Sequence, residues 1–377
     1  MNTVSPAVAR ESPRGALYVP IAVFVVTSTL LWIGFGVRPA NDSMFFVSGA
    51  EQLRRGQLVH VGYLGYMAFV AIVQSAGLGP RGVMFGQWLL SGCVVIALFD
   101  LGRRLGGRLA GGMAATLYAV NVDILRFTFY ILSDSLFTST LLLAVYAAYR
   151  ATTEAARRWT FAALGLGLAT GVMRFNGWFM WPLLFEWTIR ASRLRPPQRW
   201  AVRIGVTLCY VPLLLTGLAM TRSTDMGDGL LRDGRVIWAD RASAVPMPSA
   251  PAGSVWLPPA IDYMVRYPVT SAALIARRVV TEGVHTRRFY SRSHNLAIAI
   301  VMPLLYGLAA VGWWASRRSS FAWLCAWLLG TEMLLVGLTS ADWDGRYLVM
   351  VLPIVTLWSG VGLARTYEAG MRRERVG

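Results

Sequence analysis

The sequence predicts an all-α polytopic membrane protein with about ten transmembrane helices. Of the 377 residues, 55% are hydrophobic and only 15% are charged, whereas soluble domains carry about 25% charged residues. Uncharged stretches recur along the chain, and several approach the roughly 20 residues that a helix needs to cross a bilayer. No soluble segment separates from these stretches, so residues 1–377 are expected to form a single integral membrane domain.

The apolar stretches set the expected order of the helices. The first, Ala16–Phe35, carries no charge, is too long for the apolar region of a signal peptide and has no clear cleavage site, so it is expected to be retained. A short span at 177–189 follows its neighbour through a tight turn at Arg174–Gly177. By length, the expected spans are 16–35, 83–100, 109–124, 134–149, 160–174, 177–189, 201–220, 295–315, 321–339 and 347–364.

The distribution of arginine predicts the orientation in the membrane. With the N-terminus inside, the cytoplasmic segments are 100–108, 150–159, 190–203, 315–320 and the C-terminal tail. These segments hold clusters of arginine, whereas the short outer turns near Asp134, Arg174 and Asp344 hold one each. Because basic residues concentrate on the cytoplasmic side, the pattern predicts a multi-pass protein of the inner (plasma) membrane with both termini in the cytoplasm.

Two longer stretches are expected outside. In the first, 36–82, the apolar run Val61–Leu78 contains three glycines and two polar residues, so we expect it to lie in the interface or re-enter rather than cross. Counting it as a span would also turn the arginine-rich loops outward. In the second, 221–293, the segment Ile261–Glu282 interleaves apolar residues with arginines and predicts an amphipathic helix on the outer interface.

The net charge of +17 is explained by contact with membrane lipids, since basic loops attract anionic headgroups. No basic patch with interleaved aromatic residues lies outside the expected spans, which argues against nucleic acid as a partner. The basic stretch Arg287–Arg292 could bind phosphate or anionic headgroups, or could be a solvated basic face.

An isolated acid, Asp42, follows the first span directly. Phe46, Ala50 and Leu53 come after it at spacings of four, four and three, so all four residues share one face of a short amphipathic helix. Gly56 is expected to end that helix. The alternative is that Asp42 only caps the helix, which aspartate does well.

The pattern D-x-x-x-F-x-x-x-A-x-x-L-x-x-G after the first span resembles the first outer loop of the GT-C superfamily of membrane glycosyltransferases. More narrowly, it is similar to the branch of bacterial aminoarabinose transferases and protein O-mannosyltransferase-like enzymes (glycosyltransferase family 39-like). Similar features follow in order at Phe99–Gly107, Tyr130–Asp134, Gly165–Arg174 and Gly345–Tyr347. Two departures stand out: Ser43 replaces the usual second acid, and the large outer domain of many relatives is missing.

The resemblance implies an inverting transfer of a sugar from a polyprenyl phosphate to a lipid, glycan or protein acceptor at the outer face. Asp42 would act as the catalytic base. The substrate-binding residues would be Arg346, Tyr347, Arg174, Arg126 and Asp134, with arginine suited to the lipid phosphate. For each arginine the alternative is snorkelling or a structural pair with Asp134, Asp342 or Asp344.

No cofactor follows from the sequence with certainty. Asp123 and Asp134 flank the second outer loop and are candidate ligands for a divalent metal cation, as in some relatives, although Asp134 could equally cap a helix. Two other functions stay open. One is a transporter or flippase-like lipid-binding protein without catalysis, and the other is a lipid-linked polysaccharide polymerase or ligase.

Overall fold

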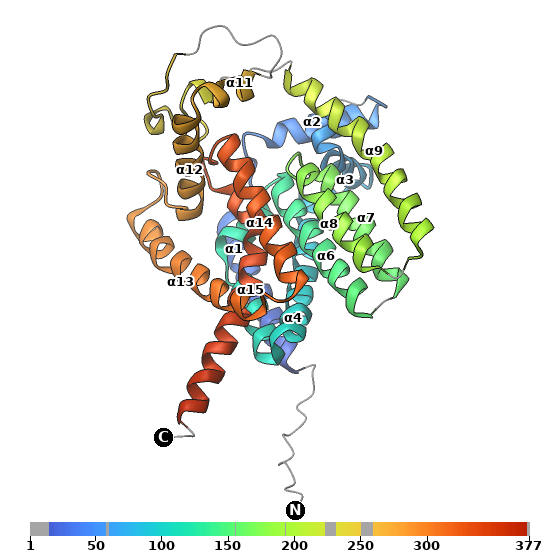
Figure 1. The fold of residues 1–377 in the computed structure, drawn as a ribbon, viewed down its shortest axis with the longest axis vertical. Helices are drawn as coiled ribbons and strands as arrows, with labels where there is room; N and C mark the ends of the chain where they lie inside the picture. Colours follow the sequence, from blue (N-terminus) through green and yellow to red (C-terminus); the bar gives the residue numbers. More distant parts are fainter. Residues whose placement is uncertain are drawn as a thin grey trace, which may run out of the picture.

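The computed structural model is a bundle of α-helices (Figure 1) and describes residues 15–57, 60–154, 156–192, 194–222, 231–249 and 259–374. Parts of the expected outer loop 221–293 lie outside these ranges. Within them the regular elements are all helical. The α-helices are α1 (Gly15–Phe35), α2 (Ser43–Arg54), α3 (Leu64–Ser75), α4 (Gly79–Ala119), α5 (Val122–Leu125), α6 (Ser133–Glu154), α7 (Arg157–Met173), α8 (Gly177–Ala191), α9 (Pro196–Arg222), α11 (Pro259–Arg266), α12 (Pro268–Val284), α13 (Arg292–Ser316), α14 (Ser320–Leu338) and α15 (Arg346–Glu374). Short 3-10 turns lie at Val61–Tyr63 (η1), Arg126–Phe129 (η2) and Arg241–Ser243 (η3).

Each expected span is helical, with α4 supplying two of them. Its backbone leaves helical geometry at Gly106 and at Gly107, where φ is 85°. The hydroxyls of Ser91 and Tyr118 are 2.6 Å apart across this break. The two halves of α4 therefore run antiparallel, as the separate spans 83–100 and 109–124 predict. The second half ends five residues early because the side chain of Asn121 caps the short helix α5.

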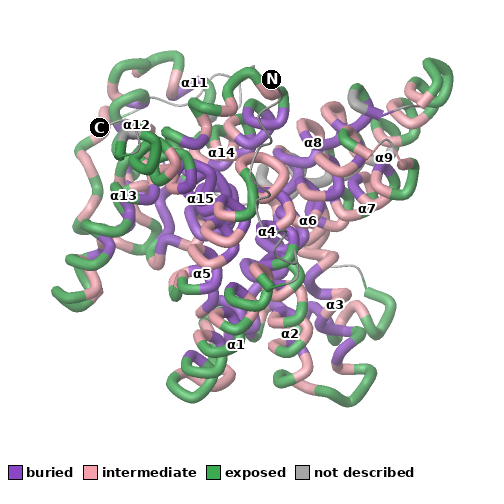
Figure 2. Tube along the Cα trace, turned by 90° about the horizontal axis from the view of Figure 1, so that it is seen from below, coloured by how far each residue is buried: buried purple, intermediate pink, exposed green. Residues whose placement is uncertain are grey.

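Five helices in the described part of the chain, α1, α4, α13, α14 and α15, are long and apolar enough to cross a membrane by length and composition. Helix α15 forms the centre of the bundle and is the most buried of the five (Figure 2). It packs mainly against α4 and α13. Glycines permit these close approaches, because a side chain at Gly360 would collide with Ala114 and one at Gly362 with Leu308. The chain is thus a multi-pass membrane protein with a helical core.

The loops expected on one side of the membrane contact each other at one end of the bundle. The carboxylate of Asp100 accepts hydrogen bonds from Arg104 at 2.7 Å and from Arg150 at 3.1 Å. Arg104 also reaches Glu154 at 2.9 Å. The start of α1 and the end of α15 lie toward this end, whereas α2 and α11 lie at the opposite end (Figure 1). This arrangement is what the expected alternation of loops requires.

The segment Val61–Leu78 forms η1 and then α3, a helix of 12 residues. Such a helix rises about 18 Å, which is less than the roughly 30 Å of a bilayer's hydrocarbon core. Its contacts are with α2, α4 and α7. The segment is therefore too short to cross as one straight helix, in keeping with the interfacial or re-entrant placement expected for it.

The segment Ile261–Glu282 forms two helices rather than the single helix expected, because Pro268 starts α12 and the backbone of Tyr267 before it leaves helical geometry, with φ −126° and ψ 61°. The exposed face of α12 is mostly apolar and includes Val269 and Val280, together with Arg277. Glu282, by contrast, is fully buried. The polar side chains toward the end of α12 thus reach into the protein, where they support the site described next.

Candidate functional site

Asp42 and Arg346 meet at the end of the bundle opposite the chain termini. Their side chains are 304 positions apart in sequence, and Arg346 Nη1 donates to Asp42 Oδ2 at 2.9 Å. The Asp42 side chain is 52% exposed and that of Arg346 22%. Asp42 makes no side-chain capping bond to α2. The capping alternative is therefore not what the structure shows, and the acid faces an arginine at an accessible position.

Helix α2 holds Asp42 in place through the face that the sequence predicts. Phe46 and Ala50 are buried, and Leu53 is half-buried. The ring of Phe46 packs edge-on against Tyr66, with centroids 4.9 Å apart. Gly56 lies just beyond the helix at a φ of 78°, the left-handed conformation expected of a glycine that ends a helix.

Ser43, the departure from the family pattern, has a structural role. Its hydroxyl accepts a hydrogen bond from Ala40 N at 2.8 Å and donates one to Ile131 O at 3.1 Å. Arg38 N donates to Phe129 O at 2.9 Å alongside. These bonds tie the first outer loop to the second, so Asp42 is fixed next to the loop that leads to Asp134.

Asp342 orients Arg346 from behind. This buried carboxylate accepts from Arg346 Nε at 3.2 Å, and its other oxygen accepts from Asp344 N at 2.7 Å and Arg346 N at 3.2 Å. The guanidinium of Arg346 thus uses Nε toward Asp342 and Nη1 toward Asp42. Its Nη2 has no hydrogen bond among the described residues. One edge of the planar fork is available to an anion.

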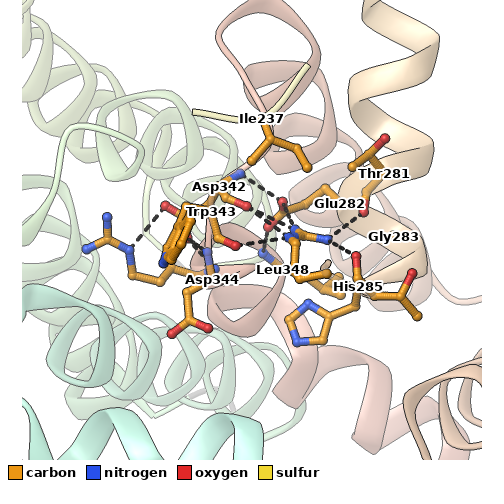
Figure 3. Close-up of polar contacts among 12 residues, drawn as sticks. Ile237, Thr281, Glu282, Gly283, His285, Asp342, Trp343, Asp344 and Leu348 are labelled. Atoms are coloured by element: carbon orange, nitrogen blue, oxygen red, sulfur yellow. Dashed lines mark hydrogen bonds and ion pairs between the residues drawn. The ribbon is translucent and has the colours of Figure 1, made fainter. Parts of the chain in front are cut away.

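A second buried network, shown in Figure 3, supports the loop that carries Asp342. Glu282 accepts from Asp342 N at 2.9 Å, from Leu348 N at 3.0 Å and from Arg287 Nη2 at 3.0 Å. Burial raises the pKa of Glu282 to about 7, with Asp342 adding to the shift and Arg287 opposing it. Nothing in the sequence distinguishes Glu282, since one acid at the end of an amphipathic pattern is typical of a solvated face.

Arg126 is held by acids on both sides. Its Nη2 donates to Asp344 Oδ1 at 3.1 Å and to Tyr290 Oη at 3.3 Å, and its Nε lies 3.5 Å from Asp123 Oδ1. Burial acts to lower the pKa of Arg126, but Asp344 and then Asp123 outweigh it and raise that pKa above its ordinary value. The structural pairing considered for Arg126 is therefore present.

Arg174 and Asp134 form a buried pair, with Arg174 Nη1 donating to Asp134 Oδ1 at 2.7 Å. The guanidinium lies 5.4 Å from the ring centroid of Tyr347. Behind it, Asn176 Nδ2 donates to the buried Glu332 at 2.7 Å. Asp134 Oδ2 and Glu332 Oε2 have no hydrogen-bond partner among the described residues. The sequence does hold a signal for Glu332 that the candidate list above omits, since a single acid within an apolar span is costly and marks a functional position.

The two candidate metal ligands have different partners. Asp134 pairs with Arg174, whereas Asp123 lies 3.7 Å from His285 Nε2 and 3.8 Å from His294 Nε2. Burial lowers the pKa of His285 to about 4, with Asp123 opposing the shift, so this imidazole is neutral at pH 7. Across the described ranges, no three or more His, Cys, Asp or Glu side chains gather as a metal site would require. The structure does not bring Asp123 and Asp134 into one ligand set.

Comparisons with known proteins agree with this architecture. Residues 66–215 match the sequence model of a family described as dolichyl-phosphate-mannose-protein mannosyltransferase. The fold resembles the crystal structure of ArnT from Cupriavidus metallidurans in the apo state, at 14% identity over 94% of this chain with a TM-score of 0.52. It also resembles the same protein bound to undecaprenyl phosphate, at 15% identity over 92% of this chain with a TM-score of 0.50. In both comparisons this chain spans 60% of the matched chain's length. No match is found among curated protein sequences.

Proposed function

Because the chain has the polytopic GT-C fold and carries a mannosyltransferase family match, we propose that it is a membrane glycosyltransferase that uses a polyprenyl-phosphate sugar. The sugar would move with inversion to a hydroxyl of a lipid, glycan or protein acceptor at the outer face. The observation that carries this proposal is the pair formed by Asp42 and Arg346, because it sets a proton acceptor beside a phosphate-binding group.

Each group in the pair has a defined part in the transfer. Asp42 takes the proton of the acceptor hydroxyl while the oxygen of that hydroxyl forms a bond to the anomeric carbon of the sugar. The bond from that carbon to the phosphate oxygen breaks at the same time, and attack from the opposite side inverts the centre. The departing lipid phosphate gains negative charge, which the free edge of Arg346 stabilises. Phosphate bound to Arg346 also competes with Asp42 for the guanidinium and frees the carboxylate to act as base.

An apolar cavity of about 420 Å³ lies between α12, α13, α14 and α15 and provides a place for the isoprenoid chain of the donor. Its lining holds no charged side chain. Leu348 contributes to the lining and comes two residues after Arg346. Gly283, another lining residue, follows Glu282 of the supporting network. A lipid tail in this cavity would therefore begin close to the phosphate-binding arginine.

The proposed orientation places both termini and the arginine-rich loops in the cytoplasm, with the site at the outer face of the inner membrane. The arginine asymmetry supports it. The common end of the bundle reached by the start of α1 and the end of α15, opposite α2 and α11 (Figure 1), supports it too.

The direct test incubates purified protein with radiolabelled polyprenyl-phosphate sugars and a pool of lipid, glycan and protein acceptors. We expect transfer of label to one acceptor class, release of polyprenyl phosphate and inversion at the anomeric carbon. Binding of the donor without any transfer would instead favour a transporter or flippase-like protein. Repeated addition to a growing glycan would identify a polymerase.

A further inference from the structure

The basic stretch Arg287–Arg292 divides into residues of different kinds. The guanidinium of Arg287 is buried and satisfied by Glu282 and by backbone carbonyls, including that of Asp342 at 3.0 Å. Arg288, the next residue, is exposed and has no hydrogen bond or ion pair among the described residues. Arg287 therefore has a structural role, whereas the charge of Arg288 is not paired with any described residue.

A cavity of about 270 Å³ lies beside Arg288, between α12 and the segment 231–249. Arg277 of α12 lines it as well and is likewise exposed and unpaired within the described ranges. Thr281 and Thr286 add two hydroxyls that make no hydrogen bond among the described residues. Thr281 lies close to Glu282 on α12 in Figure 3. Four donor groups without a partner among the described residues, two on α12 and two in the turn after it, thus line this cavity.

The other polar groups of the lining are already occupied. Asp240 Oδ1 accepts from Ala242 N at 3.0 Å, and the hydroxyl of Ser243 donates to Asp240 O at 2.7 Å. Asp240 is the only acid in the lining, and because Arg287 is paired with Glu282, the two arginines 277 and 288 remain against it. The cavity therefore carries an excess of positive charge and of unsatisfied donors, which favours an anion.

We propose that this cavity binds a phosphate group. Arginine guanidinium groups form strong bidentate bonds with phosphate oxygens, and threonine hydroxyls complete such a shell. Ligand pockets for drug-sized molecules usually measure about 300–1,000 Å³, so this smaller cavity suits one headgroup rather than a whole sugar lipid. The phosphate can belong to the headgroup of an anionic lipid or to a water-soluble phosphate ester.

The cavity is coupled to the Asp42–Arg346 site through one loop. Ala341 N donates to Val236 O and Trp238 N donates to Ala341 O, both at 2.8 Å. Val236 is part of the cavity wall, and Ala341 directly precedes Asp342. A phosphate-bearing molecule bound here would lie behind the loop that orients Arg346. The binding itself does not depend on glycosyl transfer, so it can be tested even if that activity is absent.

The test measures binding to the purified full chain in detergent by calorimetry, with glycerol 3-phosphate in one arm and short-chain phosphatidylglycerol in the other. Short-chain diacylglycerol, which has the same acyl chains but no phosphate, is the comparison. We expect saturable binding in at least one of the first two arms, and a loss of affinity of at least about tenfold in the double variant Arg277→Gln, Arg288→Gln. Binding of both probes would mean that the phosphate alone is recognised, and binding of phosphatidylglycerol alone would identify a lipid headgroup.

The matched control is Arg292→Gln, which removes the same charge outside the cavity lining and should leave the affinity unchanged. Because Arg277 and Arg288 are exposed, the double variant should keep the unfolding temperature of the wild type. Absence of saturable binding in both arms, equal binding of the phosphate-free diacylglycerol, or equal affinity in the double variant would overturn the proposal.

Discussion

The carboxylate of Asp342 binds both the side chain and the backbone of Arg346, because it accepts hydrogen bonds from Nε and from the main-chain N of that arginine, each at 3.2 Å. The same carboxylate is nearly inaccessible to solvent, with a side-chain exposure of 1%. Because Nε is bonded to Asp342 and Nη1 to Asp42, the guanidinium keeps only Nη2 without a hydrogen bond among the described residues.

Replacing Asp342 by asparagine should lower both stability and transfer. Both carboxylate oxygens of Asp342 accept hydrogen bonds, whereas asparagine has only one acceptor oxygen. Its NH2 group would therefore face either Arg346 or the backbone N–H groups that Asp342 now satisfies. A buried donor left without an acceptor costs about 1–3 kcal/mol. Thermal unfolding in detergent measures the loss. An unfolding temperature equal to that of the wild type would show that the Asp342 contacts do not support the site.

Arg346→Lys should retain the positive charge but lose the planar fork that serves Asp342 and Asp42 together. Donor affinity and turnover should both fall, by about 10- to 100-fold for the loss of one or two charge-assisted bonds. Steady-state kinetics with varied donor concentration measure both. Arg55→Lys, at an exposed helical pair with Glu51, is the matched control. If Arg346→Lys leaves donor affinity and turnover unchanged, Arg346 has only a structural role.

Ser43→Ala should reduce stability by about 1 kcal/mol, because it removes the hydrogen bonds to Ala40 and Ile131. Ser43→Asp should cost more, since a carboxylate would face the carbonyl of Ile131 in a buried position. Thermal unfolding of the two variants tests whether Ser43 stabilises the contact between the first and second outer loops. Full stability with an aspartate at this position would contradict that assignment.

The pH dependence of stability should change in His285→Asn, where asparagine tolerates the left-handed backbone at this position. The pKa of His285 is depressed to about 4, so its contribution is present above its unfolded pKa of about 6.5 and is lost as the pH falls. The pKa of Glu282 is raised to about 7, so its contribution is present at low pH and is lost as the pH rises above about 4.5.

Between pH 7 and pH 5 the two contributions oppose each other in the wild type. Removing His285 leaves only the contribution of Glu282. When the pH is lowered from 7 to 5, the free energy of unfolding of the variant should therefore rise by about 2 kcal/mol relative to that of the wild type. Thermal unfolding of both proteins at the two pH values provides the comparison. A constant difference between the two unfolding temperatures would show that His285 is not held neutral.

The helices could be predicted from sequence because hydrophobic length is a local property. The turn within α4 was also visible, since Gly106 and Gly107 follow a run of arginines between two apolar stretches. The break between α11 and α12 was not expected because the apolar pattern continues across Pro268, although proline restricts the residue before it.

The candidate site was predictable in its members but not in its contacts. Charged residues are scarce at the ends of apolar spans, and this makes site candidates of Asp42, Asp134 and Arg346. Their partners depend on residues brought together from distant parts of the chain, such as Arg126 and Asp344, which are 218 positions apart. Local sequence patterns do not encode such pairs, and the contacts of Glu282 with Arg287 and Asp342 could not be predicted for the same reason.

The central claim is that Asp42 removes the acceptor proton, and the most direct measurement is the rate of sugar transfer by Asp42→Asn. Asparagine preserves size and capping ability, so insertion and thermal stability should match the wild type. Loss of the base should lower the rate about 10²- to 10⁴-fold, while donor binding persists. Transfer at the wild-type rate, or a variant that fails to fold, would contradict the account and leave Asp42 a structural partner of Arg346.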